Sequence, residues 1–322
     1  MLPALVAVLI AGAIWRARHL KALEALTYEH RRLGNDGIVI GGEAFVLERM
    51  DAPAILLLHG AGDTPQSLRY LATALHARGF HVVVPLLPGH GRTVRDFNRV
   101  TADALTSAAH AHYDAVRATH EWVGIIGLSM GGALAVQLAA DRSDVPAIGL
   151  LAPYLAMPKR VERAAIASHL WGPVFPIVRS TEGQSVLDPE EQAQNLAYGV
   201  FTPGALRALR DTMRRALERL PRVQVPTLVI QSREDNRIAP ADAERAFRLI
   251  GSSEKCLEWI RALPTSSRWT TGATRCSRDS RRSWSHMCRR EPASHAALRR
   301  IRNVLDALGD RLTKLLDGFD AG

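Results

Sequence analysis

A serine between two glycines is the feature of this chain that points most directly to chemistry. The pentapeptide GLSMG at residues 127–131 has the form G-x-S-x-G, with an apolar run at 123–128 and a segment of helical character at 131–140. A serine on such a strand-to-helix turn projects above the sheet, beside the positive end of the helix. Its hydroxyl can then attack a carbonyl carbon. The pattern therefore predicts acyl transfer through Ser129.

A second glycine-rich turn is expected to serve the same reaction. The residues HGAG, at positions 59–62, end an earlier apolar run at 54–58. Acyl transfer needs backbone N–H donors that point at the oxyanion of the tetrahedral intermediate. We expect the N–H groups of Ala61 and Met130 to form this oxyanion hole, since one follows the HG turn and the other follows the serine. His59 is expected to brace the turn.

The order of apolar and amphipathic segments predicts how these turns are held. Apolar runs alternate with segments of helical spacing, which implies an α/β fold with a mainly parallel, doubly wound sheet. Two shorter strand-like runs at 37–40 and 44–47 come first. The expected strands are 54–58, 81–87, 123–128, 145–151, 226–231 and 255–260, and the expected helices are 67–78, 102–119, 131–140 and 241–249.

This alternation stops at Pro153 and resumes near residue 226, which divides the chain. Between these points, apolar and aromatic side chains such as Leu170 and Phe175 occur without strand character, so we expect a helical cap over the carboxyl ends of the strands. The predicted parts are an apolar N-terminal segment (1–21), a first core part (22–154), the cap insertion (155–222), a second core part (223–261), an Arg/Ser-rich segment (262–290) and an amphipathic C-terminal helix (291–322).

Three motifs together resemble a known family. LLLHGAG, VVVPLLPGHGRT and GLSMGG occur in an order and spacing similar to the carboxylesterase, monoacylglycerol lipase and lysophospholipase branch of the serine α/β-hydrolases, over about residues 53–260. The resemblance implies an α/β-hydrolase fold and hydrolysis of a carboxylic ester through an acyl-enzyme on Ser129, without metal or organic cofactor. The substrate would be a monoacylglycerol, a lysophospholipid or a short-chain ester.

The resemblance also assigns a catalytic acid. In this family the acid follows a late strand in a pattern like G-x-x-D-x-x-V-x-P, and the stretch QSREDNRIAP at 231–240 matches it with Asp235, Ile238 and Pro240 in place. Its neighbour Glu234 is expected to be a solvated loop charge.

The catalytic histidine of the family has no counterpart at its expected position. It should follow the strand at 255–260 in a pattern like G-H-V-I-x-x-D, but the chain has no Val, Ile or Leu from Pro264 to Ala297. His286 and His295 lie farther on and match nothing. We predict a frameshift from Pro264 to about Glu291, because the shifted reading frame is compatible with HVITVDYGRDEVFA. A genuine Arg/Ser-rich disordered insert is the alternative.

Composition narrows the range of partners. The net charge is +9, but seven arginines and one aspartate between residues 264 and 290 account for most of it, and no nucleic-acid motif accompanies them. The three cysteines have neither metal-ligand spacing nor an even disulfide framework. We therefore expect a small ester or lipid as substrate, and no nucleic acid.

The N-terminal segment allows two interpretations. Residues 2–15 are uncharged, and Arg16, Arg18 and Lys21 follow them, which is the reverse of a signal peptide. The run is short for a spanning helix of about 20 residues. It is either a membrane anchor that keeps the catalytic domain on the cytoplasmic side, or a buried or interfacial helix of a cytoplasmic protein.

Two functional alternatives also stay open. One is another α/β-hydrolase reaction, namely thioester or peptide hydrolysis or acyl transfer. The other is a catalytically impaired protein that retains the pocket and binds a ligand, which the missing histidine favours.

Overall fold

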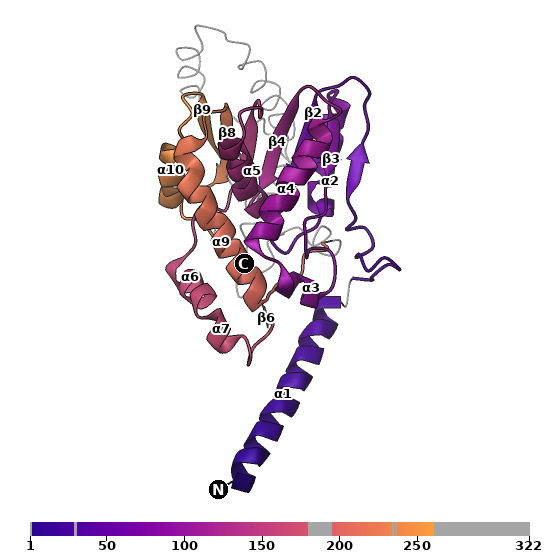
Figure 1. Ribbon diagram of the computed structural model, residues 1–322, viewed down its shortest axis with the longest axis vertical. Helices are drawn as coiled ribbons and strands as arrows, with labels where there is room; N and C mark the ends of the chain where they lie inside the picture. The colour runs from indigo at the N-terminus through magenta and orange to yellow at the C-terminus, as the bar shows by residue number, and fades with distance from the viewer. Residues whose placement is uncertain (1, 29–30, 180–194, 234, 236, 261–322) are drawn as a thin grey trace, which may run out of the picture.

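The computed structural model describes residues 2–28, 31–179, 195–233, 235 and 237–260, and within them it has one large sheet (Figure 1). The sheet contains seven described strands in the order β1-β3-β2-β4-β5-β8-β9, parallel throughout except for β1. This arrangement confirms the predicted α/β class. The strands are β1 (Phe45–Leu47), β2 (Ala54–Leu58), β3 (His81–Val84), β4 (Val123–Leu128), β5 (Ile148–Leu151), β8 (Thr227–Ser232) and β9 (Lys255–Ile260).

The central strands are buried on both faces, as continuous apolar runs require in a parallel sheet. Every residue of β2, β4, β5 and β8 is buried. The register aligns the carboxyl ends of β4, β5 and β8, because Leu128 pairs with Leu151 and Leu151 pairs with Ile230. Residues that follow these strands therefore meet at one edge of the sheet.

Helices cover both faces of the sheet (Figure 1). On one face, Leu71 and Leu75 of α2 pack against Ile55 and Leu57. On the other, α4, α5, α9 and α10 enclose the larger apolar cluster. The helices around the sheet, with the short α3 that precedes α4, are α2 (Arg69–Ala77), α3 (Val94–Arg99), α4 (Ala102–Arg117), α5 (Met130–Asp141), α9 (Pro203–Arg219) and α10 (Pro240–Leu249). Threonine side chains cap α3, α4 and α9 at their N-termini, from Thr93, Thr101 and Thr202.

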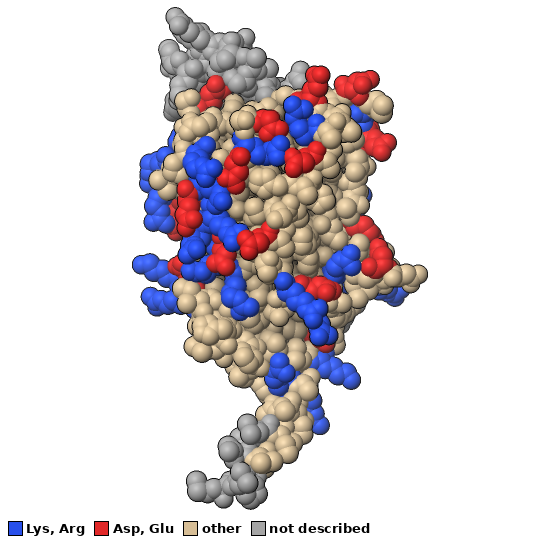
Figure 2. Space-filling view, in the orientation of Figure 1, with Lys and Arg blue, Asp and Glu red and all other residues tan. Residues whose placement is uncertain are grey.

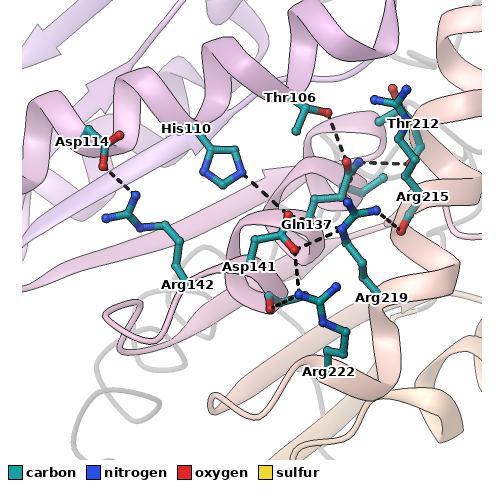
Figure 3. A network of polar contacts seen from close by, with 12 residues as sticks. Thr106, His110, Asp114, Gln137, Asp141, Arg142, Thr212, Arg215, Arg219 and Arg222 are labelled. Atoms are coloured by element: carbon teal, nitrogen blue, oxygen red, sulfur yellow. Dashed lines mark hydrogen bonds and ion pairs between the residues drawn. The ribbon is translucent and has the colours of Figure 1, made fainter.

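The segment between β5 and β8 contains α6 (Lys159–Ile166), α7 (Ser168–Trp171), a two-stranded sheet of β6 (Val178–Arg179) and β7 (Val200–Phe201), and α9. Polar side chains join α9 to the core (Figure 3). Buried Gln137 of α5 donates to the carbonyl of Thr212 in α9 at 3.1 Å and accepts from Thr106 of α4 at 3.1 Å. The last helix of the predicted cap is therefore packed on the core, and the predicted division of the chain into core and cap stays a prediction.

The N-terminal helix α1 (Leu2–Tyr28) projects from the body at the end where α6 and α7 lie (Figure 1). Its C-terminal turns are attached to the core, since Leu23 is buried and the Tyr28 hydroxyl accepts a hydrogen bond from the Val94 N–H at 2.9 Å. No helix in the described part of the chain is long and apolar enough to cross a membrane.

Some predictions differ from the structure or lie outside it. The strand expected at 37–40 is a single bridge between Leu33 and Val39, because Gly37 and Gly41 adopt positive φ angles and turn the chain. The strand expected at 81–87 ends at Val84. Glu234, residues 262–290 with His286, and residues 291–322 with His295 lie outside the described residues.

Candidate active site

Ser129 is the single residue between β4 and α5. Its backbone has a positive φ, at φ 52° and ψ −114°, and this conformation is unfavourable for any residue other than glycine. Hydrogen bonds hold it there: its N–H donates to the Leu151 carbonyl at 2.9 Å, and its carbonyl accepts from the Tyr154 N–H at 3.0 Å. The strained turn therefore depends on the end of the neighbouring strand β5, and it places the serine at the N-terminus of α5.

The two glycines of the motif are needed for close backbone contacts. A Cβ at position 127 would lie 2.1 Å from the Gly131 carbonyl oxygen, and a Cβ at position 131 would lie 2.0 Å from the Leu58 carbonyl oxygen. These contacts also bring the HGAG turn against the serine, since a Cβ at Gly60 would be 3.5 Å from the Cβ of Ser129. The tight approach brings two turns from different strands together.

The N–H groups of Ala61 and Met130 lie on these two turns. Ala61 follows Gly60, and Met130 is the first residue of α5. Neither N–H donates a hydrogen bond to another described residue. Unpaired N–H donors beside a serine can stabilise negative charge that develops on a carbonyl oxygen. Their role as an oxyanion hole stays a prediction.

His59 braces the HGAG turn, as the sequence suggested. Its ring is fully buried; Nδ1 donates to the Gly60 carbonyl at 2.9 Å, and Nε2 accepts from the Leu87 N–H at 3.0 Å. Burial, followed by the neighbouring His90, lowers the pKa of His59 to about 3. With both nitrogens occupied and the ring neutral, His59 does not serve as a base for Ser129.

Asp235 follows β8 on a loop that orients its carboxylate. Oδ1 accepts from the backbone N–H groups of Arg237 at 2.7 Å and Ile238 at 3.0 Å. Oδ2 accepts from the amide of Gln231, a buried residue near the end of β8. No motif in the sequence singles out Gln231. The only signal for it was a glutamine four positions before the acid, at the end of an apolar strand.

Ser129 and Asp235 lie at the same edge of the sheet, one strand apart. β4 leads to the serine, β8 leads to the acid, and β5 lies between them in aligned register. At about 4.8 Å between neighbouring strands, β4 and β8 are roughly 10 Å apart, a span that an imidazole ring with its two hydrogen bonds can bridge. The segment expected to supply that ring follows β9, the strand next to β8, and lies outside the described residues.

A buried carboxyl group near the site was not anticipated. Asp63 follows the HGAG turn, and burial raises its pKa to about 6, against the opposing hydrogen bonds from Ser67 and the Thr64 N–H. Its Cβ lies 4.0 Å from the position that a Cβ on Gly60 would take. The turn that presents Ala61 is thus flanked by buried ionisable groups, His59 and Asp63.

A mainly parallel sheet that delivers a strained serine to a helix N-terminus, beside a glycine-rich turn from the adjacent strand, defines the α/β-hydrolase class. Residues 51–263 match the family described as Serine aminopeptidase, S33, and the chain belongs to this family of hydrolases. The match ends one residue before Pro264.

Individual relatives agree with this assignment. The thermostable monoacylglycerol lipase of Bacillus sp. (strain H-257) is 29% identical over 218 residues, which cover 68% of this chain and 84% of that protein. The carboxylesterase of Bacillus subtilis (strain 168) is 24% identical over 64% of this chain and 81% of its own length. A solved structure from work on LipS and LipT, two metagenome-derived lipolytic enzymes, aligns with a TM-score of 0.60 and 30% identity, covering 68% of this chain and 87% of its own. These similarities confirm the predicted resemblance to esterases and monoacylglycerol lipases.

Proposed function

We propose that this protein is a serine esterase of the lipase type, which cleaves a carboxylic ester through an acyl-enzyme on Ser129. The observation that carries the proposal is the conformation of Ser129, held at φ 52° between β4 and α5. Beside it lie the N–H groups of Ala61 and Met130, neither of which donates a hydrogen bond to another described residue. Backbone strain of this kind is retained where surrounding structure enforces it, and it clusters at active sites.

The proposed reaction proceeds in two acyl transfers. A base takes the proton of the Ser129 hydroxyl as its oxygen attacks the ester carbonyl carbon, and the Ala61 and Met130 N–H groups stabilise the oxyanion. The protonated base gives its proton to the leaving alcohol, and the acyl-enzyme forms. Water then attacks the acyl carbon by the same route and releases the acid. Asp235, oriented by Gln231 and the loop N–H groups, would hold the base.

The proposed substrate is a monoacylglycerol, a lysophospholipid or a short-chain ester. The similarity to a monoacylglycerol lipase and a carboxylesterase supports this class. The predicted cap is also rich in apolar residues in its sequence, which favours an acyl chain over a polar substrate.

The base is proposed to be a histidine encoded in a shifted reading frame after residue 263. The end of the family match at that residue supports this proposal, since Pro264 is where the family pattern is lost. Sequencing the genomic DNA across codons 255–295 tests it directly. An extra or missing base within these codons is the expected result, and an uninterrupted frame that encodes the arginine-rich segment overturns it.

Assays of the two versions test the proposed function itself. The chain with the frame restored is expected to hydrolyse p-nitrophenyl butyrate at about 10 s⁻¹, and the chain as written at least about 1,000-fold more slowly, because a serine without a base is a weak nucleophile. Ser129→Ala in the restored chain is the control, and it should abolish turnover and labelling by a fluorophosphonate. Equal turnover by the restored chain and its Ser129→Ala variant would refute Ser129 as the nucleophile.

A ligand-binding protein without turnover is the second candidate, favoured by the missing histidine. It predicts that genomic DNA encodes the chain as written, that neither Ser129 nor any other serine reacts with a fluorophosphonate, and that an acyl ester binds without cleavage. Isothermal titration with a non-hydrolysable monoacylglycerol ether distinguishes it from the esterase.

A further inference from the structure

Exposed apolar side chains gather at the end of the molecule towards which the carboxyl ends of the parallel strands point. They come from two segments that are far apart in sequence. Ile10, Ile14 and Trp15 lie on α1, whereas Leu170, Val174 and Phe175 lie on α7 and the loop after it. We call these six residues the apolar tip. Each is at least 42% exposed, and Leu170 reaches 71%. Exposed apolar groups clustered in this way mark an interaction surface.

Two contacts join the halves of the apolar tip. The rings of Trp15 and Phe175 meet edge to face, with centroids 5.7 Å apart and an angle of 88°. Next to them, the Arg16 guanidinium donates to the Pro173 carbonyl at 2.6 Å. The projecting helix and the segment that follows α7 therefore present one continuous surface, in which the aromatic pair and the adjacent arginine lie at the same level.

The charges around the apolar tip are mostly positive. Residues 2–28 and 159–179 contain seven Lys and Arg against two Glu. None of the seven forms an ion pair with a described residue. On α1 the basic side chains lie where the helix meets the body, and the described residues farther out are uncharged (Figure 2). Unpaired cations around an apolar surface complement anionic lipid headgroups.

The outer part of α1 suits the hydrocarbon of a bilayer. Residues 2–15 have no charged or hydrogen-bonding side chain except the indole of Trp15, so this part of the helix is apolar on every side. At 1.5 Å per residue these residues extend about 21 Å, more than the roughly 15 Å of hydrocarbon in one leaflet. They can therefore enter the bilayer end-on or at a tilt, with Trp15 at the interface and Arg16, Arg18 and Lys21 among the headgroups.

We propose that the apolar tip and the N-terminal half of α1 dock this protein onto an anionic phospholipid membrane, with the cap facing the lipid. The Trp15–Phe175 contact sets the cap at the depth of the membrane interface. Together with the proposed lipid-ester hydrolysis, on which this consequence rests, docking would deliver acyl substrates to the cap directly from the membrane.

Flotation of the full chain with vesicles tests the proposal. The protein carries Ser129→Ala, so that the result does not depend on turnover and stands even if the proposed function fails. Vesicles of phosphatidylcholine alone are compared with vesicles in which part is replaced by phosphatidylglycerol. We expect binding to the anionic vesicles at least about tenfold tighter, and weakened by added salt. No binding to anionic vesicles overturns the proposal.

Paired variants separate the two halves of the surface. Ile10→Glu with Ile14→Glu should weaken binding at least about 100-fold, and Leu170→Glu with Val174→Glu at least about tenfold, because a carboxylate is costly in the membrane. Arg18→Gln with Lys21→Gln should remove most of the preference for anionic lipid. Met50→Glu is the matched control, because Met50 is also exposed and apolar but lies before β2, at the edge of the sheet farthest from the apolar tip. This substitution should change vesicle binding less than about twofold.

Other occupants of the surface give different results. If a second copy covers it, sedimentation without lipid shows a dimer that the Leu170→Glu, Val174→Glu variant dissociates, and vesicle binding is absent. If another part of this chain covers it, the same variant lowers the thermal midpoint while the parent protein does not bind vesicles. Either result overturns membrane docking.

Discussion

Gly131 and Leu58 touch through their backbones: a Cβ at position 131 would lie 2.0 Å from the Leu58 carbonyl oxygen. This contact joins the helix that follows the serine to the end of β2, and thereby sets the HGAG turn beside Ser129. Close packing of α5 on the end of β2 thus explains a glycine that the catalytic motif also demands.

Gly131→Ala is expected to lower the free energy of unfolding by about 3 kcal/mol or more, because a methyl group cannot fit without moving the Leu58 carbonyl. Urea unfolding followed by circular dichroism measures this loss. Gly12→Ala is the matched control, since a Cβ at that helical position meets no atom within 4 Å. It should stabilise by up to about 1 kcal/mol. Equal effects of the two substitutions would contradict the packing argument.

His90→Asn is expected to reduce the acid sensitivity of folding. Burial lowers the pKa of His90 to about 4, below its value of about 6.5 in the unfolded chain. Between these values the unfolded state takes up a proton that the folded state does not, so stability is lost as the pH falls through 6.5 towards 4. At pH 5 the loss is about 2 kcal/mol for this residue alone.

Asparagine can keep the hydrogen bond that Nδ1 of His90 makes to the Pro88 carbonyl at 2.9 Å, but it does not titrate. Unfolding free energies at pH 7.5 and pH 5 are compared for both proteins. His59 acts in the same direction, whereas the raised pKa of Asp63 adds stability as the pH falls from 6 to 4. An unchanged difference between the two pH values in the variant would show that His90 is not a source of acid sensitivity.

Gln137→Leu should cost about 1–3 kcal/mol, because the buried amide joins α4, α5 and α9 (Figure 3). Arg219→Gln removes a partly exposed ion pair to Asp141 in the same network, at 3.2 Å, and should cost less than about 1 kcal/mol. Chemical unfolding of both variants measures the difference. A larger loss of unfolding free energy for Arg219→Gln than for Gln137→Leu would contradict this ranking of the two contacts.

Asp235→Asn, made in a chain that hydrolyses p-nitrophenyl butyrate, should lower kcat about 10⁴-fold, because an amide no longer holds the base in its active tautomer. Glu234→Gln is the adjacent control and should change kcat less than about twofold. Steady-state kinetics give kcat and KM separately for each. Comparable losses of kcat from the two substitutions would contradict the choice of Asp235 over Glu234 as the catalytic acid.

The sequence by itself determined the class of fold and the local geometry of the nucleophile, because both depend on short-range patterns. The apolar run before Ser129, the glycines around it and the helix after it are contiguous, and the structure has β4 at the residues expected. Even the bracing role of His59 followed from its place in the HGAG turn. The acid Asp235 required the family resemblance, since a single aspartate in a loop carries no local signal.

Only the tertiary structure decided the contacts between distant segments. Three contacts depend on side-chain directions that no periodicity in the sequence encodes. They are the hydrogen bond from Gln231 to Asp235, the hydrogen bond from Gln137 to Thr212, and the packing of Trp15 on Phe175. The same holds for the pKa of Asp63, which is raised by burial under the folded chain rather than by its neighbours in sequence. Non-local packing places these groups, and desolvation then sets their chemistry.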